Sequence, residues 1–338
     1  MKPKVAVLLL RNYRGQPLSE AVIYHKDIQR LEQFAQIINT DMPDADPGTV
    51  RQIIAGADAC LTGWGTPKLT TEILDAAPNL KMIAHTAGSV KPIVSDAVWE
   101  RGIKVTSGAA AIAVGVAEHA LGLMLSTMKR TYWLNDIIHK GGWLDKDERN
   151  KIVEAYGIKV GVIGAGNAGR HFIKLLSNFD LDILLYDPFV SDEAAKQMGV
   201  VKYDNLDDMM READVISIHA PSLPETASMI NSHNLKLLKD GAIIINTARG
   251  AIIDESALYD ELKTGRITAC LDVTEPEPPL EDNPLRSLPN VVFTPHIAGA
   301  IANNMARMGS YAVSELERFF TGETLKYEVT QQDLARLA

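Results

Sequence analysis

The sequence feature that most constrains the fold is a glycine-rich turn, Gly164-Ala165-Gly166-Asn167-Ala168-Gly169. It follows the apolar run Ile158–Ile163 and precedes residues 168–178, whose apolar side chains recur at helical spacing. A G-x-G-x-x-G sequence between a strand and a helix is typical of a dinucleotide-binding βαβ unit. The alternative is a glycine-rich turn in some other α/β protein.

Each glycine of this turn has its own physical task. Gly164 allows the tight turn, Gly166 lets the backbone approach a pyrophosphate, and Gly169 lets the helix pack closely on the strand. The amides of Asn167 and Ala168 are expected to face the phosphates, because they lie at the positive end of the helix dipole.

An acidic residue follows at the spacing expected for a ribose contact. Asp187 ends the next apolar run, about 20 residues after the turn, where a carboxylate bonds the ribose hydroxyls. A carboxylate there repels the 2′-phosphate of NADP, and no Arg or Lys follows until Lys196. The sequence therefore predicts NAD as the cofactor, with NADH preferred over NADPH. The alternative role for Asp187 is that of a helix cap.

Short apolar runs alternate with helix-like segments along most of the chain, which predicts α/β domains with parallel sheets covered on both faces. A length of 338 residues favours two such domains. Two long helices are predicted, at residues 114–128 and about 304–320. The predicted strands are residues 5–10, 59–62, 80–85 and 103–106 in a first series, and residues 158–163, 183–186, 215–218, 242–246, 268–271 and 291–294 in a second.

Composition narrows the possible partners and the location. The chain has 34 basic and 43 acidic residues, so no basic excess favours nucleic acid. Cys60 and Cys270 lie in apolar runs and are expected to be buried thiols. No metal site is predicted, because no cysteine or acidic partner stands at ligand spacing from His25, His119, His139, His171 or His233. No segment is expected to span a membrane, and a cytoplasmic location is expected.

Three polar side chains follow predicted strands of the second series, at the edge where open α/β sheets bind ligands. They are Arg249, Glu277 in an acidic loop, and His296. An arginine can bind a carboxylate through its planar fork, and a histidine can deliver a proton near neutral pH. A carboxylate beside the histidine favours imidazolium and orients the ring. The reduction of a 2-keto acid needs these three groups.

Each of the three also has a structural alternative. Arg249 fits an exposed turn, His296 a hydrogen-bonded structural histidine, and Glu277 a solvated loop charge. Their common position beside the glycine-rich turn favours the functional interpretation. A fourth polar residue, His219, ends the strand 215–218 and is expected to contact the adenosine half of the cofactor.

These motifs resemble the D-isomer-specific 2-hydroxyacid dehydrogenase family, in its glyoxylate and hydroxypyruvate reductase-like form, over nearly the whole chain. The most specific stretches are the glycine-rich turn, residues 246–258, residues 271–278 and residues 288–296. The resemblance implies that Arg249 orients the substrate, that His296 is the acid/base, and that Glu277, rather than Glu275, supports it.

The resemblance also implies further contacts and an assembly. It places Asp272 near the nicotinamide amide and Thr247 along the cofactor. It implies a Rossmann NAD-binding domain, residues 108–297, inserted into a flavodoxin-like substrate domain made of residues 1–107 and 298–338. A homodimer is the implied assembly.

One loop departs from the family. The loop that holds the substrate carboxylate through backbone amides usually carries a Gly-Tyr-Asp-like sequence, whereas residues 85–92 here read His-Thr-Ala-Gly-Ser-Val-Lys-Pro. Gly88, Ser89 and Val90 are expected to keep the backbone role. Glyoxylate, hydroxypyruvate or a short-chain relative is the expected substrate class. The alternatives are a formate- or phosphite-type dehydrogenase and a corepressor-like protein that binds NAD(H) without catalysis.

Overall fold

The computed structural model describes residues 1–337 and divides into two compact units. The first contains Met1–Ile112 and the chain from Ala300 onward, and the second contains Ala113–Gly299. The chain thus leaves the first unit after Ile112 and returns to it at Ala300. The boundaries expected from the sequence were a departure after residue 107 and a return at residue 298.

The first unit is built on a six-stranded sheet in the order β13-β5-β4-β3-β1-β2. Its first five strands are parallel in the order 2-1-3-4-5, which is flavodoxin-like, and β13 pairs antiparallel to β5. The strands are β1 (Lys4–Leu8), β2 (Gln36–Ile37), β3 (Ala59–Thr62), β4 (Met82–His85), β5 (Lys104–Ser107) and β13 (Glu328–Val329).

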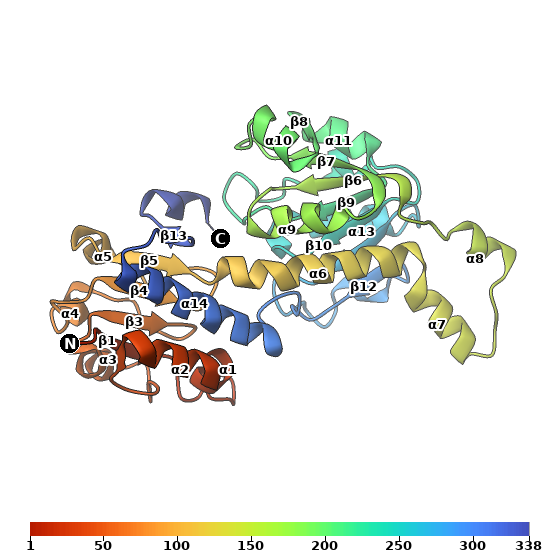
Figure 1. Cartoon of the computed structure of the whole chain (residues 1–338). Coiled ribbons are helices and arrows are strands. Elements are labelled where there is room, and N and C mark those ends of the chain that lie inside the picture. The colour runs from red at the N-terminus through yellow and green to blue at the C-terminus, as the bar shows by residue number, and fades with distance from the viewer. Residues whose placement is uncertain (338) are drawn as a thin grey trace. The chain divides into compact units, whose positions relative to one another are not determined.

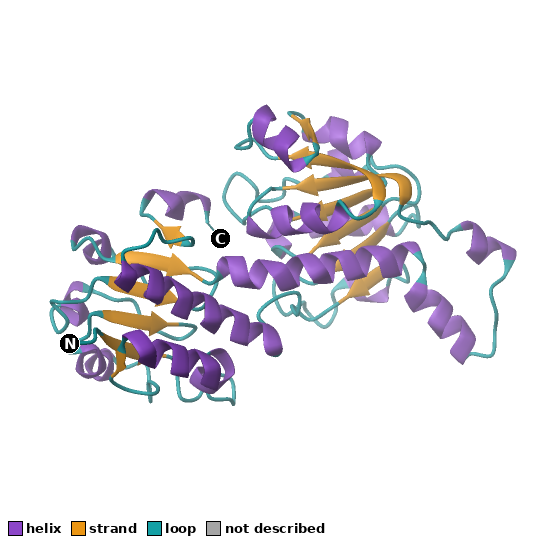
Figure 2. Ribbon diagram, in the orientation of Figure 1, coloured by secondary structure: helices purple, strands orange, loops and turns teal. Residues whose placement is uncertain are grey.

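Helices cover both faces of this sheet, as Figure 2 shows. One face packs against α1 (Leu18–Val22), α2 (His25–Phe34) and α14 (Asn303–Thr321), and the other against α3 (Pro47–Ile54), α4 (Thr71–Leu74) and α5 (Asp96–Glu100). The central strands β3 and β4 are buried from both sides, so they are largely apolar rather than alternating, whereas the edge strands β2 and β13 each have an exposed residue.

The second unit is built on a seven-stranded parallel sheet in the order β12-β11-β10-β9-β6-β7-β8. The strand order reverses at β6, as in a Rossmann fold. The fold class predicted from the sequence is confirmed for both units. The strands are β6 (Tyr156–Ile163), β7 (Asp180–Tyr186), β8 (Val201–Tyr203), β9 (Val215–Ile218), β10 (Ile243–Asn246), β11 (Thr268–Leu271) and β12 (Val291–Phe293).

Two hydrophobic clusters cover the faces of this second sheet. One includes side chains of α11 (Leu206–Glu212), α12 (Ser232–Leu235) and α13 (Glu255–Leu262), and the other includes side chains of α6 (Ala109–Met128), α9 (Asn167–Leu176) and α10 (Asp192–Met198). Short 3-10 turns lie at Gly250–Ile252, Pro284–Ser287 and Gln332–Arg336.

One expectation about membranes needs correction. The helix α6 begins at Ala109 rather than at residue 114, and its 20 residues are long and apolar enough to cross a membrane. Its composition has another explanation in the structure, because Ala117, Leu123 and Met124 are buried in the core of the second unit. We therefore describe α6 as a core helix.

Candidate active site

The candidate functional side chains of the second unit share one edge of its sheet. Because all seven strands are parallel, the segments that follow β6, β10, β11 and β12 leave from the same carboxyl-terminal edge. These segments carry the glycine-rich turn, Arg249, Glu277 and His296 in that order. This is the edge at which α/β sheets bind ligands.

The side chain of His296, in the segment after β12, pairs with that of Glu277, in the segment after the neighbouring strand β11. Its Nδ1 lies 2.5 Å from Oε1 of Glu277, while both side chains remain partly open to solvent. The structure shows no such contact for Glu275, whose backbone amide donates to Glu255 Oε1 at 2.7 Å. When Nδ1 donates to the carboxylate, Nε2 is the ring nitrogen left to exchange a proton.

The backbone of His296 adopts an uncommon conformation. Its φ is +52°, in the left-handed region that non-glycine residues rarely occupy. The amide of His296 donates to the carbonyl oxygens of Asp272, at 2.9 Å, and Thr294, at 3.1 Å. Surrounding contacts of this kind are what hold a strained backbone in place at functional sites.

Asp272 anchors the loop that carries His296. Its buried carboxylate accepts hydrogen bonds from Thr294 Oγ1 at 2.5 Å, from the amide of Ile297 at 2.9 Å and from the amide of Ala298 at 2.9 Å. The two residues that follow His296 are therefore fixed by a single carboxylate. This contact was not foreseen from the sequence, which assigned Asp272 to the cofactor through resemblance alone.

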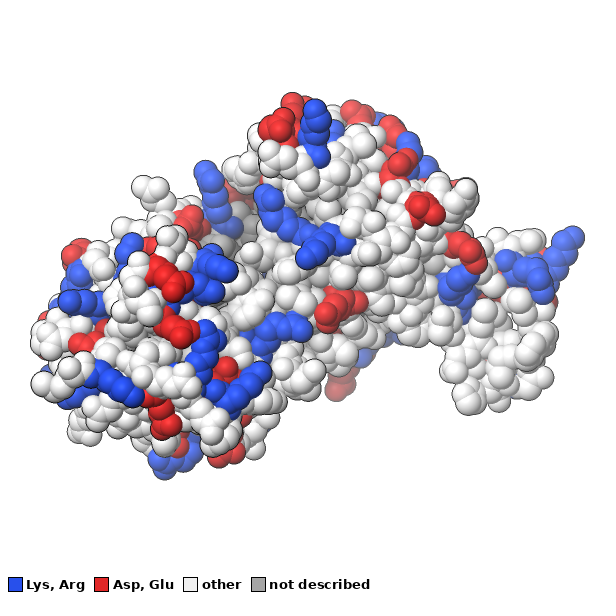
Figure 3. Space-filling view, in the orientation of Figure 1, with Lys and Arg blue, Asp and Glu red and all other residues white. Residues whose placement is uncertain are grey.

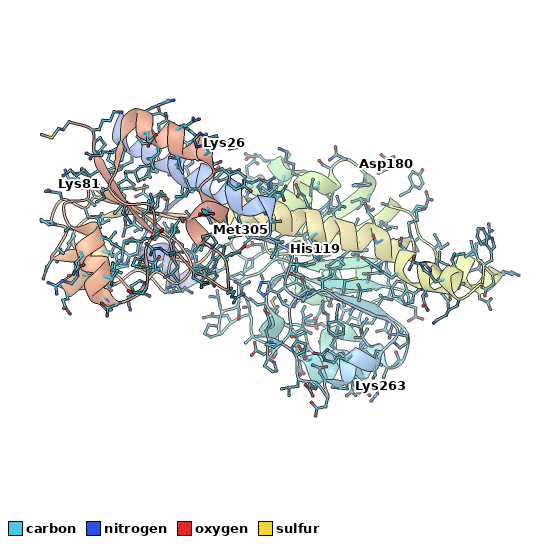
Figure 4. All side chains as sticks on the ribbon, turned by 90° about the horizontal axis from the view of Figure 1, so that it is seen from below. Lys26, Lys81, His119, Asp180, Lys263 and Met305 are labelled. Atoms are coloured by element: carbon cyan, nitrogen blue, oxygen red, sulfur yellow. The ribbon has the colours of Figure 1, made fainter. Side chains whose placement is uncertain are left out.

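His119 is a residue whose partners sequence reasoning missed. It lies on α6 (Figure 4), with Nε2 3.1 Å from Thr294 Oγ1 and 3.7 Å from Asp272 Oδ1. Its partners stand more than 150 residues away in the chain, so spacing along the sequence does not reveal them. The resemblance to the family extends more weakly to Val116-Ala117-Glu118-His119, and this is the signal in the sequence that draws attention to His119.

The turn that carries Arg249 is fixed by Asn246 and Gly250. Asn246 is buried, donates from Nδ2 to the carbonyl of Arg249 at 2.8 Å, and accepts from the amide of Ala248 at 3.0 Å. A Cβ on Gly250 would lie 2.1 Å from the carbonyl carbon of Thr274, so this turn packs against the acidic loop. Among the described residues, the exposed Arg249 guanidinium donates only to the carbonyl of Ala248, at 2.7 Å, which leaves most of its N–H groups available to an anion.

The glycine-rich turn has the shape that a pyrophosphate needs. Gly164 has a φ of +91°, and a Cβ on Gly169 would lie 2.0 Å from the carbonyl oxygen of Gly164. A Cβ on Gly166 would meet nothing within 4 Å, so the backbone is open there. No side chain caps the start of α9, and the first amides of this helix remain available to phosphate oxygens.

Asp187 closes the turn from the neighbouring strand. Its Oδ2 accepts from the amide of Ala165 at 2.7 Å, and its Oδ1 accepts from the amide of Phe189 at 2.8 Å. It does not cap the next helix, since Ser191 caps α10. Each carboxylate oxygen can accept a second hydrogen bond, so the group still fits a ribose hydroxyl.

Two buried polar atoms near this edge lack partners among the described residues. They are Oγ1 of Thr247 and Nδ1 of His219. Burial lowers the pKa of His219 to about 3, so this ring is neutral, and a Cβ on Gly169 would lie 3.5 Å from its Cβ. Because buried polar atoms are seldom left unpaired, these atoms and the open Gly166 backbone fit a bound dinucleotide.

The proposed substrate loop lies in the first unit and follows β4. Its carbonyl at Gly88 accepts from Ser107 Oγ at 2.6 Å, while within residues 1–337 the amides of Gly88, Ser89 and Val90 have no acceptor. His85 connects this loop to the sheet. Its ring forms a hydrogen bond with the Ser89 backbone, and its Nδ1 lies 2.9 Å from Thr62 Oγ1. Burial lowers the pKa of His85 to about 4, so the ring is neutral. Free amides in succession form a site for an anion.

Neither cysteine is exposed. Cys60 and Cys270 are buried, as predicted, and burial raises the pKa of both thiols to about 12. Among residues 1–337, no group of three or more His, Cys, Asp or Glu side chains is placed to hold a metal ion.

On the face shown in Figure 3, acidic and basic side chains are interspersed on both units.

The pairing of His296 with Glu277 rather than Glu275 gives a direct prediction. Replacing Glu277 with glutamine removes the charge beside the imidazole, and we expect turnover to fall about 10- to 100-fold, since a hydrogen bond to a charged group contributes about 1.5–3 kcal/mol. The matched variant Glu275→Gln is expected to keep nearly full activity. Equal losses in both variants, measured by steady-state kinetics, would contradict the pairing.

Comparison with known proteins places these features in a family. Residues 121–298 match the family model described as the NAD-binding domain of D-isomer specific 2-hydroxyacid dehydrogenases. The chain is 38% identical over 268 residues to the hydroxypyruvate reductase of Thermotoga maritima, covering 78% of this chain and 85% of that protein. It is 36% identical over 282 residues to the D-3-phosphoglycerate dehydrogenase of Methanocaldococcus jannaschii, covering 83% of this chain and 53% of that protein.

The chain thus spans about half the length of the phosphoglycerate dehydrogenases it matches. Among solved structures, a phosphoglycerate oxidoreductase from Rhizobium etli superposes with a TM-score of 0.83 at 22% identity, covering 98% of this chain and 99% of the other. At that identity the likeness establishes the fold alone.

Proposed function

The chain belongs to the D-isomer-specific 2-hydroxyacid dehydrogenase family, whose members are NAD-dependent oxidoreductases acting on the CH–OH group, and from this we propose that it interconverts a small 2-keto acid and its D-2-hydroxy acid. The observation that carries the proposal is the His296–Glu277 pair at the sheet edge that also bears Arg249 and the glycine-rich turn.

Each residue is assigned one task in this proposal. The bound nicotinamide supplies the hydride that C2 receives. His296, as imidazolium, gives a proton to the oxygen bound to C2, and takes it back when the hydroxy acid is oxidised. Glu277 orients the ring through the contact with Nδ1. Arg249 binds the substrate carboxylate through paired hydrogen bonds.

The remaining residues are assigned to the substrate or to the cofactor by the hydrogen bonds that they can form. The free amides of Gly88, Ser89 and Val90 suit a carboxylate. Asn167 and Ala168 provide amides for the pyrophosphate at the start of α9. Thr247 and His219 offer the unpartnered polar atoms described above to the cofactor, and Asp272 acts by positioning His296 as well as by its proposed contact with the nicotinamide amide.

We propose NADH rather than NADPH as the cofactor because of Asp187. Replacing Asp187 with alanine removes both the ribose acceptor and the charge that repels a 2′-phosphate. We expect kcat/KM for NADH to fall about 10- to 100-fold, as for loss of a hydrogen bond to a charged group, and the NADPH-to-NADH ratio to rise. The control is Asp182→Ala, an exposed carboxylate on the same strand. An unchanged cofactor ratio would contradict this role.

We propose a cytoplasmic homodimer in which α7 (Thr131–His139) and α8 (Lys146–Asn150) form part of the interface. These helices extend away from the sheet of the second unit (Figure 1), and they contain no buried residue. Large apolar side chains are exposed along this segment, at Tyr132, Ile138 and Trp143. Exposed apolar clusters of this kind mark interaction surfaces.

The test of the proposed function is a substrate panel. NADH oxidation is measured with glyoxylate, hydroxypyruvate, pyruvate and longer 2-keto acids, and the measurement is repeated with NADPH. Turnover of at least one 2-keto acid, faster with NADH, is the expected result. Tight NADH binding without turnover of any 2-keto acid would overturn the proposal in favour of a cofactor-sensing protein or a phosphite-type enzyme.

A further inference from the structure

An aromatic pair lies at the same sheet edge as the substrate loop in the first unit. The strands β1, β3 and β4 are neighbours, and their last residues are in register. Tyr13 lies in the segment that follows β1, Trp64 in the loop that follows β3, and Gly88 in the loop that follows β4. The loop that carries Trp64 therefore stands between Tyr13 and the proposed carboxylate site.

Close contacts join these three segments. A Cβ on Gly63 would lie 3.0 Å from Thr86 Oγ1, so the loop before Trp64 packs directly on the start of the substrate loop. On the other side, the rings of Tyr13 and Trp64 stack at 6.3 Å between centroids with an interplanar angle of 18°. A Cβ on Gly65 would lie 3.7 Å from the ring of Tyr13.

The turn that presents Tyr13 is rigid and locally strained. Tyr13 and Gln16 exchange two backbone hydrogen bonds, of 2.8 and 3.2 Å. Between them Arg14 has a φ of +52°, which is unfavourable for a residue with a Cβ and is found at functional sites more often than elsewhere. The Arg14 guanidinium lies 5.5 Å from the centre of the Tyr13 ring, and no carboxylate within residues 1–337 pairs with it.

We propose that Trp64 and Tyr13 determine substrate specificity by binding the tail of the 2-keto acid, and that this tail carries a flat aromatic ring, as in an arylpyruvate. The inference rests on the proposed function, because it takes Gly88 and Ser89 as the amides that hold the carboxylate. Neighbouring strands lie about 4.8 Å apart, so a ring joined to C2 through one methylene reaches the adjacent loop. Glyoxylate has no atoms that extend there.

Aromatic side chains suit this task for a physical reason. Both rings pack on the hydrophobic cluster beneath the sheet edge yet remain half-exposed, so each keeps surface for a ligand. Aromatic pairs favour offset-stacked and edge-to-face arrangements, which a ring on the substrate can adopt with either side chain. The competing explanation is that the pair only closes the end of the core.

The experiment compares phenylpyruvate with glyoxylate, using NADH and the full-length protein. The wild-type enzyme is expected to have the higher kcat/KM for phenylpyruvate. In Trp64→Ala, kcat/KM for phenylpyruvate is expected to fall about 10- to 100-fold, mainly through KM, while that for glyoxylate stays within about threefold, since burial of an aromatic ring contributes only to the substrate that has one.

The matched control is Trp99→Ala. Trp99 is also half-buried in the first unit, but it packs on the opposite face of the sheet. We expect this control to change both substrates alike and only slightly. Trp64→Leu and Tyr13→Leu keep apolar volume in the core, and they preserve the test if Trp64→Ala does not fold.

Two outcomes would overturn the inference while leaving the proposed function intact. One is an equal loss for both substrates in the Trp64 variants, which would assign the pair to the core. The other is a wild-type enzyme that turns over glyoxylate and rejects phenylpyruvate. Failure of the wild-type enzyme with every 2-keto acid would instead refute the proposed function, and the inference with it.

Discussion

Replacing His296 with alanine is expected to lower kcat about 10²- to 10⁴-fold, the range that general acid–base catalysis contributes. The variant loses the group that delivers a proton to the substrate oxygen, while the glycine-rich turn and Arg249 remain in place. We therefore expect NADH affinity to be nearly unchanged and KM for the keto acid to change little. Stopped-flow or steady-state kinetics, combined with NADH fluorescence titration, separates these quantities.

The matched control is His233→Ala. His233 is an exposed histidine of the same unit, with Nε2 2.8 Å from Asp207 Oδ2, so it also forms a pair with a carboxylate. It lies in α12, and no role in the reaction is proposed for it. Near-normal kcat in His296→Ala would contradict the assigned acid/base role, whatever the result for His233.

Replacing Arg249 with alanine is expected to lower kcat/KM about 10²- to 10³-fold, with losses in both KM and kcat. The guanidinium is proposed to hold the substrate carboxylate through paired hydrogen bonds, and loss of such a charged partner costs about 3–4 kcal/mol. Arg249→Lys keeps the charge but not the planar fork, so we expect it to recover only part of the activity.

The control for Arg249 is Arg211→Ala, which removes an exposed arginine paired with Asp208 on α11. Both variants should bind NADH with wild-type affinity, because neither side chain belongs to the proposed dinucleotide site. If Arg249→Ala retained its KM for the keto acid, the carboxylate contact would have to come from another residue.

Much of the fold could be predicted from the sequence because the central strands of both sheets are buried on both faces. The strands Ala59–Thr62, Val215–Ile218 and Thr268–Leu271 have the predicted bounds, since each is a short apolar run bounded by polar or glycine residues. The strands β2 and β8 were missed, because they are short edge strands with few apolar residues. The helix α2 ends at Phe34, because residues 36–37 pair with β1.

The candidate active site could likewise be predicted from the sequence only in part. The placement of Arg249, Glu277 and His296 at one sheet edge could be predicted because the topology of a parallel sheet brings strand ends together, and strand ends are visible in the sequence. Asn246 and His119 could not be assigned their contacts, because those contacts depend on the folded turn and on α6 packing near Thr294. The aromatic pair of Tyr13 and Trp64 likewise forms only when β1 and β3 become neighbours.

The central claim is that a hydride passes between the nicotinamide and C2 of a 2-keto acid while His296 handles the proton. The most direct test uses NADH carrying deuterium at the transferable C4 position, with product analysis by NMR and chiral chromatography. The account predicts a D-2-hydroxy acid with one deuterium on C2. A product without deuterium at C2, or the L-isomer, would contradict it.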